Sequence, residues 1–511
     1  MIWRCSSILS TLLIFQIVNS QRVTNHLPKD IIIHFDLKGA PPRPTYFLDL
    51  LTTISKLGAT GIIIEWEDMF PYSGRLERMR NGNAYSMEET LMILDHAHSL
   101  GLTIVPLVQT LGHLEWILKT KEAAHLREDP RYPMVACIGD EEAVDLILEM
   151  VNQVLDVHAK YPLPFYHIGA DEVYQIGICE ADKMKLSSKF QNDTKRLVYN
   201  HIQHVSLNIS QQQPNTKVLI WFDELRNGSP ELIEEYQLDK LVIPVVWKYT
   251  DNLDKDLPIE MWTKLSKSFR QVWGGSAFKG ADGANKIWNR MKPYVQNNKQ
   301  WFLQSVKYSA IFSDFHGFIM TGWQRYDHFA SLCETFPVSM SSLALNIKIL
   351  QNFVIIEKDI SEIAINLKCP KNTNISSILS GTDKCRFPGY NVRDLIRSFE
   401  KIKLYYENST WIHNRENGWL QSSQMLLAAS NPYNVDVVGK IYSSSISKIE
   451  KLISDLRISL IELYYDDMVE EMLIDYIYPF YDLLRTRLAS VSRIDNRNYY
   501  PPRPWLSVEK E

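Results

Sequence analysis

Two adjacent carboxylates follow a short apolar run in the segment FYHIGADEVYQIG, residues 165–177. Neighbouring side chains on a regular strand point to opposite faces, so Asp171 and Glu172 can act on one substrate only where the strand has ended. Carboxyl groups at such a place can transfer protons. The alternative is an acidic turn on the surface, which the position directly after an apolar run disfavours. The pair therefore predicts chemistry at the end of a core strand.

Short apolar runs alternate with segments of helical period between residue 30 and about residue 335. Eight such runs occur, and they cover 30–36, 61–67, 103–109, 165–172, 218–224, 241–247, 271–277 and 317–323. Apolar runs that are joined by helices are typical of parallel strands buried on both faces. Eight of them predict an α/β fold, a closed (β/α)8 barrel of the TIM type.

Helical patterns separate these runs and then dominate the end of the chain. Ser86 and Glu89 form a capping box, an apolar stripe follows, and Gly101 ends that helix. After residue 340 the strand patterns stop, and 449–491 is strongly amphipathic. We therefore divide the chain into a catalytic barrel over 21–340 and a helical C-terminal region with an irregular tail over 341–511.

Polar and aromatic residues collect at the ends of the eight runs, where barrels of this type carry their chemistry. They are Asp36, Glu65, Gln109, Asp171, Glu172, Trp221, Asp223, Trp247 and Trp323. Tryptophan faces can cover the apolar side of a sugar ring, and carboxylates can bind hydroxyls or transfer protons. No CxxC pair, HExxH helix or cofactor motif occurs. The pattern indicates a sugar pocket, and we expect neither cofactor nor metal.

The motif HIGADE resembles the His-x-Gly-x-Asp-Glu motif of family 20 glycoside hydrolases, the β-N-acetylhexosaminidases. Further segments are similar, in the same order, to the hexosaminidase D branch of that family. They read IIHFDLKGAPP, IEWEDMFPY, QTLGHLEWILK, HLREDPRYP, SAFKGADG and TGWQRYDHFASLCETFP. The resemblance covers about 30–340. It implies an exo-acting enzyme that removes terminal β-linked N-acetylgalactosamine or N-acetylglucosamine from glycoconjugates.

The resemblance also implies roles for the acidic pair. Glu172 would be the general acid/base, and Asp171 would orient and polarise the 2-acetamido group of the substrate, whose oxygen is the nucleophile of a retaining, substrate-assisted reaction. The spacing agrees, since Cα atoms about 3.8 Å apart cannot easily hold two carboxyl groups on opposite sides of a scissile bond. For its role as an acid we expect a raised pKa at Glu172.

By the same resemblance, Tyr249 would hydrogen-bond the acetamido oxygen, and three tryptophans, Trp221, Trp247 and Trp323, would form the walls of its pocket. Asp36 and Lys38 would approach sugar hydroxyls from the first strand. At the end of the fifth run, Phe222 stands where the hexosaminidase D branch more often has Asp, and we therefore expect Asp223 to be the polar contact there. His113, which follows the third run, is a candidate for a contact with the sugar or the acid. The larger hexosaminidases have an Arg on strand one and Trp-x-Glu on strand eight. This chain differs at both places, which leaves gluco and galacto sugars open as substrates.

Two alternatives belong to other classes of mechanism or function. One is a conventional retaining glycosidase in which Glu172 works with Asp223 or Glu224. The other is a catalytically inactive sugar-binding protein that keeps the pocket.

The first residues predict export. Arg4 precedes an apolar run that ends near Ser20, which is typical of a secretory signal peptide over 1–20. Asn-x-Ser/Thr sequons begin at Asn192, Asn208, Asn227, Asn374 and Asn408. We therefore expect a secreted or lysosomal glycoprotein that has no stable membrane insertion once the signal is cleaved.

Charge and cysteine content set further expectations. The formal net charge is -5, from 55 basic and 60 acidic residues, so nucleic acid is not expected as a partner. Cys369 and Cys385 flank a polar loop and are the predicted disulfide, whereas we expect Cys137, Cys179 and Cys333 to be buried thiols. The sequence is compatible with either a monomer or a homodimer.

Overall fold

Eight parallel strands form a closed barrel in the computed structural model, which describes residues 27–500, 502 and 503. Around the ring the order is β1-β10-β9-β8-β7-β6-β3-β2, and each strand pairs in parallel with both neighbours. The strands are β1 (Asp30–Asp36), β2 (Gly61–Glu65), β3 (Thr103–Leu107), β6 (Phe165–His167), β7 (Lys217–Trp221), β8 (Val242–Trp247), β9 (Gln271–Lys279) and β10 (Asp314–Gly322). Each predicted run overlaps one of them, so the predicted TIM-type barrel is confirmed.

The interior of the barrel is a packed apolar core. Its buried members are Ile32, Ile63, Val105, Leu107, Phe165, Leu219, Trp221, Val245, Trp273 and Ile319. Burying one aliphatic or aromatic side chain of this size contributes about 1.5–3 kcal/mol. Because this core fills the barrel, polar side chains at the strand ends are held on a rigid base.

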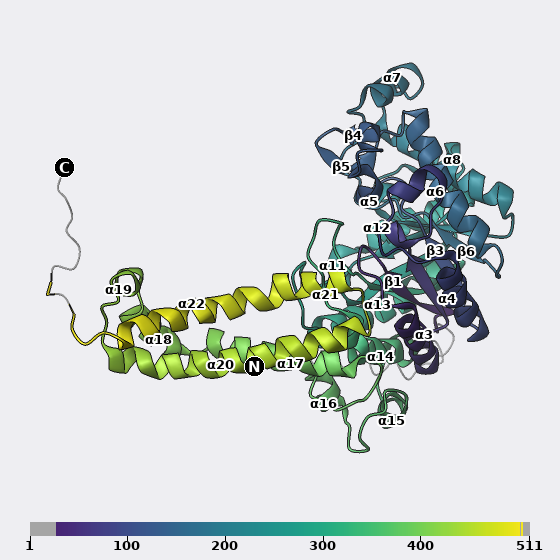
Figure 1. Ribbon diagram of the computed structural model, residues 1–511. Coiled ribbons are helices and arrows are strands. Elements are labelled where there is room, and N and C mark those ends of the chain that lie inside the picture. Colours follow the sequence, from purple (N-terminus) through teal and green to yellow (C-terminus); the bar gives the residue numbers. More distant parts are fainter. Residues whose placement is uncertain (1–26, 501, 504–511) are drawn as a thin grey trace, which may run out of the picture. The chain divides into compact units, whose positions relative to one another are not determined.

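Helices surround these strands in the first of two compact units (Figure 1). They are α3 (Pro44–Leu57), α4 (Met87–Ser99), α5 (Glu115–Leu118), α6 (Glu141–His158), α7 (Glu180–Ser188), α8 (Thr194–Gln212), α9 (Pro230–Glu235), α10 (Leu238–Leu241), α11 (Leu253–Asp256), α12 (Ile259–Ser268), α13 (Met291–Tyr308), α14 (Phe336–Asn352), α15 (Glu357–Asn366) and α16 (Ile375–Leu379). The predicted capping box at α4 is present, because the Ser86 hydroxyl accepts from the Glu89 amide and the Glu89 carboxylate accepts from the Ser86 amide.

The first unit extends to Pro388, and the second begins at Gly389. Residue 340, where the strand patterns of the sequence stop, lies inside α14. This helix packs on α13 and β9 and is buried from Phe336 to Leu350. It therefore completes the helical layer of the barrel. A helix buried on all sides has no clear polar face, so the amphipathic period does not reveal its partner.

The second unit is helical, as predicted. It contains α17 (Tyr390–Glu407), α18 (Thr410–Trp419), α19 (Ser422–Leu427), α20 (Pro432–Ile461), α21 (Asp466–Met472) and α22 (Tyr478–Asp495). The long helices α20 and α22 lie side by side (Figure 1). The amphipathic stretch 449–491 is thus divided between helices, with a π-helical turn at Leu473–Ile477.

Two disulfides are present among the described residues of the first unit. The predicted bond between Cys369 and Cys385 is confirmed. The expectation of buried thiols is wrong for Cys137 and Cys179, which form the second bond, and holds for Cys333, which is free and buried. Cys137 follows a separate two-stranded sheet of β4 (Arg127–Asp129) and β5 (Tyr132–Ala136), and a local sequence pattern does not show that this hairpin meets residue 179.

Removing the second disulfide should destabilise the barrel unit. Cys137 and Cys179 are 42 residues apart. A cross-link of this span lowers the conformational entropy of the unfolded chain and so raises its free energy by about 4 kcal/mol. The variant Cys137→Ser/Cys179→Ser should therefore lose about 2–4 kcal/mol in its free energy of unfolding. Urea titration without reductant measures this loss.

The matched control is Cys369→Ser/Cys385→Ser, which opens a bond between residues only 16 apart. Its loss should be the smaller one. An unchanged stability in the Cys137→Ser/Cys179→Ser variant would contradict the prediction.

Candidate active site

A cavity of about 180 Å³ opens at the C-terminal ends of the strands. Eight of the ten predicted site residues line it: Lys38, His113, Asp171, Glu172, Trp221, Trp247, Tyr249 and Trp323. The other two, Asp36 and Asp223, contact members of this group. The cavity thus brings together predicted residues from six strand ends.

The acidic pair leaves its strand through an unusual backbone turn. Strand β6 ends at His167, and φ is then positive at Gly169 (64°), Ala170 (63°) and Glu172 (48°). Residues other than glycine rarely adopt such φ values, which cost about 1–3 kcal/mol each. The alternation of a regular strand is therefore broken, and the carboxylates of both Asp171 and Glu172 line the same cavity.

Glu172 is paired with His113. The His113 Nε2 atom lies 3.2 Å from Glu172 Oε2, and the Glu172 side chain is 38% exposed. The hydrogen bond from His113 lowers the pKa of Glu172. The expected raised pKa is therefore wrong for this arrangement, because the sequence does not show that an imidazole from the loop after β3 reaches the acid.

His113 is itself surrounded by carboxylates. Its Nε2 atom lies 3.7 Å from Asp171 Oδ2, and its Nδ1 atom lies 3.8 Å from Glu115 Oε1. Burial opposes a charge on the ring, but Asp171, Glu172 and Glu115 together raise the pKa of His113 to about 10. His113 is thus a cation at neutral pH.

Asp171 is the more buried member of the pair, with 5% of its surface exposed. Burial raises its pKa, while the charge of His113 opposes that rise. Its Oδ1 atom accepts a hydrogen bond from Gln109 Nε2 at 3.1 Å. The structure therefore holds this carboxylate from one side.

Aromatic rings form another part of the cavity wall. Trp323 Nε1 donates to the Tyr249 hydroxyl at 3.0 Å, and Trp247 stacks on Tyr249 with 5.3 Å between ring centroids. Trp221 lies 6.1 Å from Trp323, also between centroids. Burial raises the pKa of Tyr249, so its hydroxyl stays protonated and keeps a hydrogen to donate.

Asp223 and Glu224 each bind another side chain of the protein. Asp223 Oδ2 accepts a hydrogen bond from Trp247 Nε1 at 2.6 Å and so orients one aromatic wall. Burial and the nearby charge of Asp171 raise the pKa of Asp223 to about 7. Glu224 forms an ion pair with Lys195 at 2.6 Å.

Lys38 is fully buried among carboxylates. Its Nζ atom lies 3.3 Å from Asp36, 3.0 Å from Glu65 and 3.2 Å from Glu67. Burial opposes the charge, but these three groups raise the pKa of Lys38 well above its usual value. Asp36 also accepts a hydrogen bond from the backbone N–H of Gln324 at 2.7 Å, so it positions both Lys38 and the segment after β10.

Four lining residues were not predicted from the sequence: Gly280, Ala281, Arg325 and Tyr326. Glu65 and Gln109 also line the cavity, and the sequence indicated them as polar strand ends without assigning them a role. Arg325 comes from the loop after β10 and donates to the Lys38 carbonyl at 3.0 Å. The two residues are 287 positions apart, so a local sequence pattern does not show this contact.

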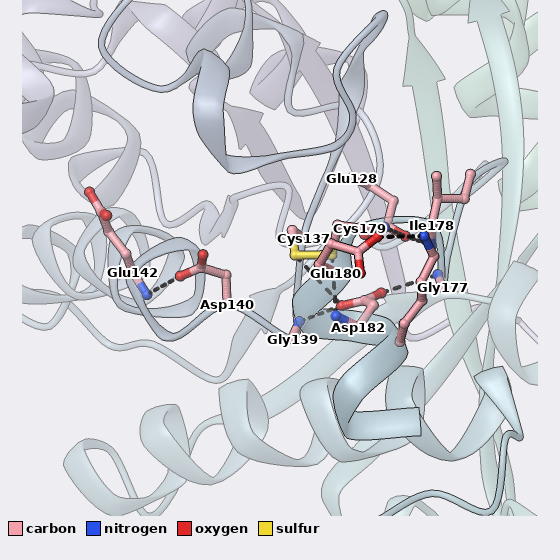
Figure 2. The surroundings of a disulfide bond; sticks show 11 residues. Glu128, Cys137, Gly139, Asp140, Glu142, Gly177, Ile178, Cys179, Glu180 and Asp182 are labelled. Atoms are coloured by element: carbon pink, nitrogen blue, oxygen red, sulfur yellow. Dashed lines mark hydrogen bonds and ion pairs between the residues drawn. A yellow bond between two sulfur atoms is a disulfide. The ribbon is translucent and has the colours of Figure 1, made fainter. Parts of the chain in front are cut away.

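The segment after the acidic pair is anchored by the disulfide between Cys137 and Cys179. Figure 2 shows two carboxylates, Glu128 and Asp182, beside this bond. Glu128 accepts from the amides of Ile178 and Cys179. These contacts fix the chain a few residues beyond Glu172.

Asp182 completes the same anchor. It accepts from the Gly139 amide at 2.5 Å and from the Gly177 amide at 3.1 Å. Glu128, Cys137, Cys179 and Asp182 have their ligand-type atoms within 4.8 Å of one another. The two sulfurs are bonded to each other and the carboxylates bind backbone amides, so this cluster serves as an anchor for the segment.

Comparison with known proteins gives consistent similarities. A family model described as the catalytic domain of glycosyl hydrolase family 20 matches residues 52–271. Human hexosaminidase D is 33% identical over 490 residues, which cover 94% of this chain and 98% of that protein. Hexosaminidase D of Bos taurus is 39% identical over 317 residues, which cover 61% of this chain and 90% of that protein. A β-N-acetylhexosaminidase structure from Bacteroides fragilis is 13% identical with a TM-score of 0.48, covering 67% of this chain and 70% of that one.

Proposed function

The chain belongs to glycosyl hydrolase family 20 and is a β-N-acetylhexosaminidase, and from this premise we propose that it removes terminal β-linked N-acetylgalactosamine or N-acetylglucosamine by a retaining, substrate-assisted reaction. One observation carries the proposal. Asp171 and Glu172, adjacent in the chain, line one cavity, which also has a wall of tryptophan and tyrosine rings. This arrangement suits an acid that acts beside a polarised acetamido group.

In the proposed first step the acetamido carbonyl oxygen attacks the anomeric carbon, and the bond to the leaving oxygen breaks. Glu172 gives its proton to that oxygen. Asp171 accepts a hydrogen bond from the acetamido N–H and balances the positive charge that develops on the cyclic oxazolinium. In the second step water gives a proton to Glu172 and attacks the anomeric carbon, while the bond from that carbon to the acetamido oxygen breaks and the acetamido group is restored. Two displacements at the same carbon retain the β configuration.

Glu172 must carry a proton in the first step, although His113 lowers its pKa in this structure. A sugar in the cavity excludes water from Glu172, and this desolvation raises the pKa of a carboxyl group. Substrate binding therefore favours the protonated acid that the reaction needs.

The conventional alternative requires a nucleophile on a neighbouring strand. Glu224 is neutralised by Lys195, and Asp223 is hydrogen-bonded to Trp247. Both carboxylates thus have structural partners, which favours the acetamido oxygen as the nucleophile. A sugar-binding protein without turnover would need no proton donor like Glu172.

Nitrophenyl substrates test the proposed function. We expect release from the β-N-acetylglucosaminide or the β-N-acetylgalactosaminide, and far slower release from the β-glucoside and β-galactoside that lack the acetamido group. Proton NMR of the first product should show the β anomer. An inverted product, or a glycosyl ester trapped on Asp223 or Glu224, would contradict the substrate-assisted reaction.

We further propose that the enzyme is exported to the cell exterior or the lysosome as a glycoprotein. The predicted signal peptide, 1–20, lies outside the described residues. Four sequon asparagines, Asn192, Asn227, Asn374 and Asn408, are exposed. Within residues 27–500, no helix combines the length and apolar composition needed to cross a membrane.

Expression in a secretory eukaryotic host should give a chain that begins at Gln21 and loses mass on enzymatic deglycosylation. Asn208 should stay unmodified, because it lies within α8, is half-buried and donates to Asn152 at 2.7 Å. Peptide mass spectrometry checks both the start and the modified sites. A chain that stays in the cytosol of the host, keeps Met1 and carries no glycan would refute the proposal.

A further inference from the structure

Gln109 uses every hydrogen-bonding atom of its side chain in the wall of the cavity. It follows β3 and is 3% exposed. Its Nε2 atom donates to Glu65 Oε1 at 3.2 Å and to Asp171 Oδ1 at 3.1 Å, and its Oε1 atom accepts from the Ala170 amide at 3.1 Å. The amide thus joins two carboxylates to the turn that carries one of them.

An amide matches these three partners and other side-chain types do not. Two carboxylate oxygens require two hydrogens, and the Ala170 N–H requires an acceptor. A carboxylic acid offers one hydrogen, a carboxylate offers none, and a lysine offers no acceptor. A neutral primary amide of this length therefore satisfies all three.

The turn is shaped around Gln109. A Cβ atom on Gly169 would lie 1.9 Å from Gln109 Oε1, so glycine is needed at that position. The next residue, Ala170, has φ of 63°, and its amide is held by the same Oε1 atom. The contact therefore fixes the left-handed backbone directly before Asp171.

The other end of the amide is equally fixed. Glu65 is fully buried, and it binds Lys38 at 3.0 Å and His34 at 2.9 Å. Gln109 is thus held at a point that is tied to strands β1 and β2. Movement of Asp171 away from Gln109 would break this chain of contacts.

We propose that Gln109 is a positioning residue for Asp171, because it occupies Oδ1 and fixes the preceding turn so that Oδ2 faces the acetamido nitrogen of the substrate. This inference rests on the proposed function. It assigns to Gln109 a second effect, since a neutral amide between Glu65 and Asp171 adds no negative charge and its hydrogens stabilise the charged form of Asp171.

Gln109→Glu tests the proposal through pH. When protonated, the new side chain is nearly isosteric and can still donate one hydrogen. When ionised, it places a third carboxylate within hydrogen-bonding distance of Glu65 and Asp171. Its kcat should therefore be about 10- to 100-fold below that of the wild type at neutral pH, the scale of one hydrogen bond to a charged group, and should recover relative to the wild type as the pH falls. The KM should change much less.

Gln109→Met separates positioning from charge. It keeps the length of the side chain but has no donor, so kcat should fall about 10- to 100-fold without the recovery at low pH. Binding of a thiazoline mimic of the cyclic intermediate should weaken by a similar factor, whereas binding of the free N-acetylhexosamine should change little, since the contact matters most when the acetamido group is charged.

Gln304→Glu is the matched control. Gln304 is also buried, accepts from Trp262 Nε1 at 3.0 Å and donates to Asp254 at 2.8 Å, but it lies on α13 and does not line the cavity. This variant should lower the thermal midpoint and keep the wild-type pH profile of kcat. A Gln109→Glu variant with the wild-type profile, or a Gln109→Met variant with unchanged thiazoline binding, would overturn the positioning role. A wild-type enzyme that ignores the acetamido group would instead overturn the proposed function.

Discussion

Asp171→Asn should lower kcat for an N-acetylhexosaminide by at least about 10²–10³-fold, while KM changes little. The carboxylate acts mainly when positive charge develops on the acetamido group, so the transition state loses more than the bound substrate. The asparagine also presents N–H hydrogens or a neutral oxygen to the substrate, which cannot balance that charge. Steady-state kinetics with a nitrophenyl N-acetylhexosaminide measures the loss.

The free energy of unfolding of Asp171→Asn is the control that separates a catalytic from a structural role of Asp171. Burial raises the pKa of Asp171, so the folded state disfavours its charge, and this cost is present at every pH above the raised pKa. It disappears as the pH falls and the carboxyl group becomes protonated. At neutral pH the asparagine variant should therefore be about as stable as the wild type or more stable. A large loss of stability together with the loss of turnover would indicate a structural role for Asp171.

The barrel could be predicted because each strand is specified locally. Runs such as DIIIHFD and GIIIE contain β-branched residues that are buried on both faces, and the structure places β1 and β2 on them. Since strand ends meet at one face of a barrel, the same pattern also gathered Asp171, Glu172, Trp221, Trp247 and Trp323.

Features that depend on contacts between distant segments could not be predicted in this way. The lowered pKa of Glu172 depends on His113, which is 59 residues away in sequence. Gln109 was visible as a polar strand end, but its three partners come from two other strand ends. The bond between Cys137 and Cys179 likewise depends on where two loops meet. Polar networks of this kind can be identified only from the folded structure, because their members are distant in the sequence.

Glu172→Gln should produce the other large loss, because general acid–base catalysis contributes about 10²–10⁴-fold. The loss in the first step should depend on the leaving group. A nitrophenolate leaves without a proton, so its release should be affected less than that of an alkyl or sugar alcohol. Pre-steady-state and steady-state rates for a series of leaving groups test this dependence, and equal losses throughout the series would remove Glu172 from the role of acid.

The second step then distinguishes Glu172 from Asp171. Water must lose a proton as it attacks the oxazolinium, and the glutamine of Glu172→Gln cannot accept that proton. Azide is an anion that attacks without giving up a proton, so added azide should accelerate Glu172→Gln with a nitrophenyl substrate and yield the β-glycosyl azide. Asp171→Asn should not be accelerated, because its defect lies in forming the oxazolinium. Acceleration of both variants, or formation of the α-azide, would contradict the proposed division of roles between these two adjacent carboxylates.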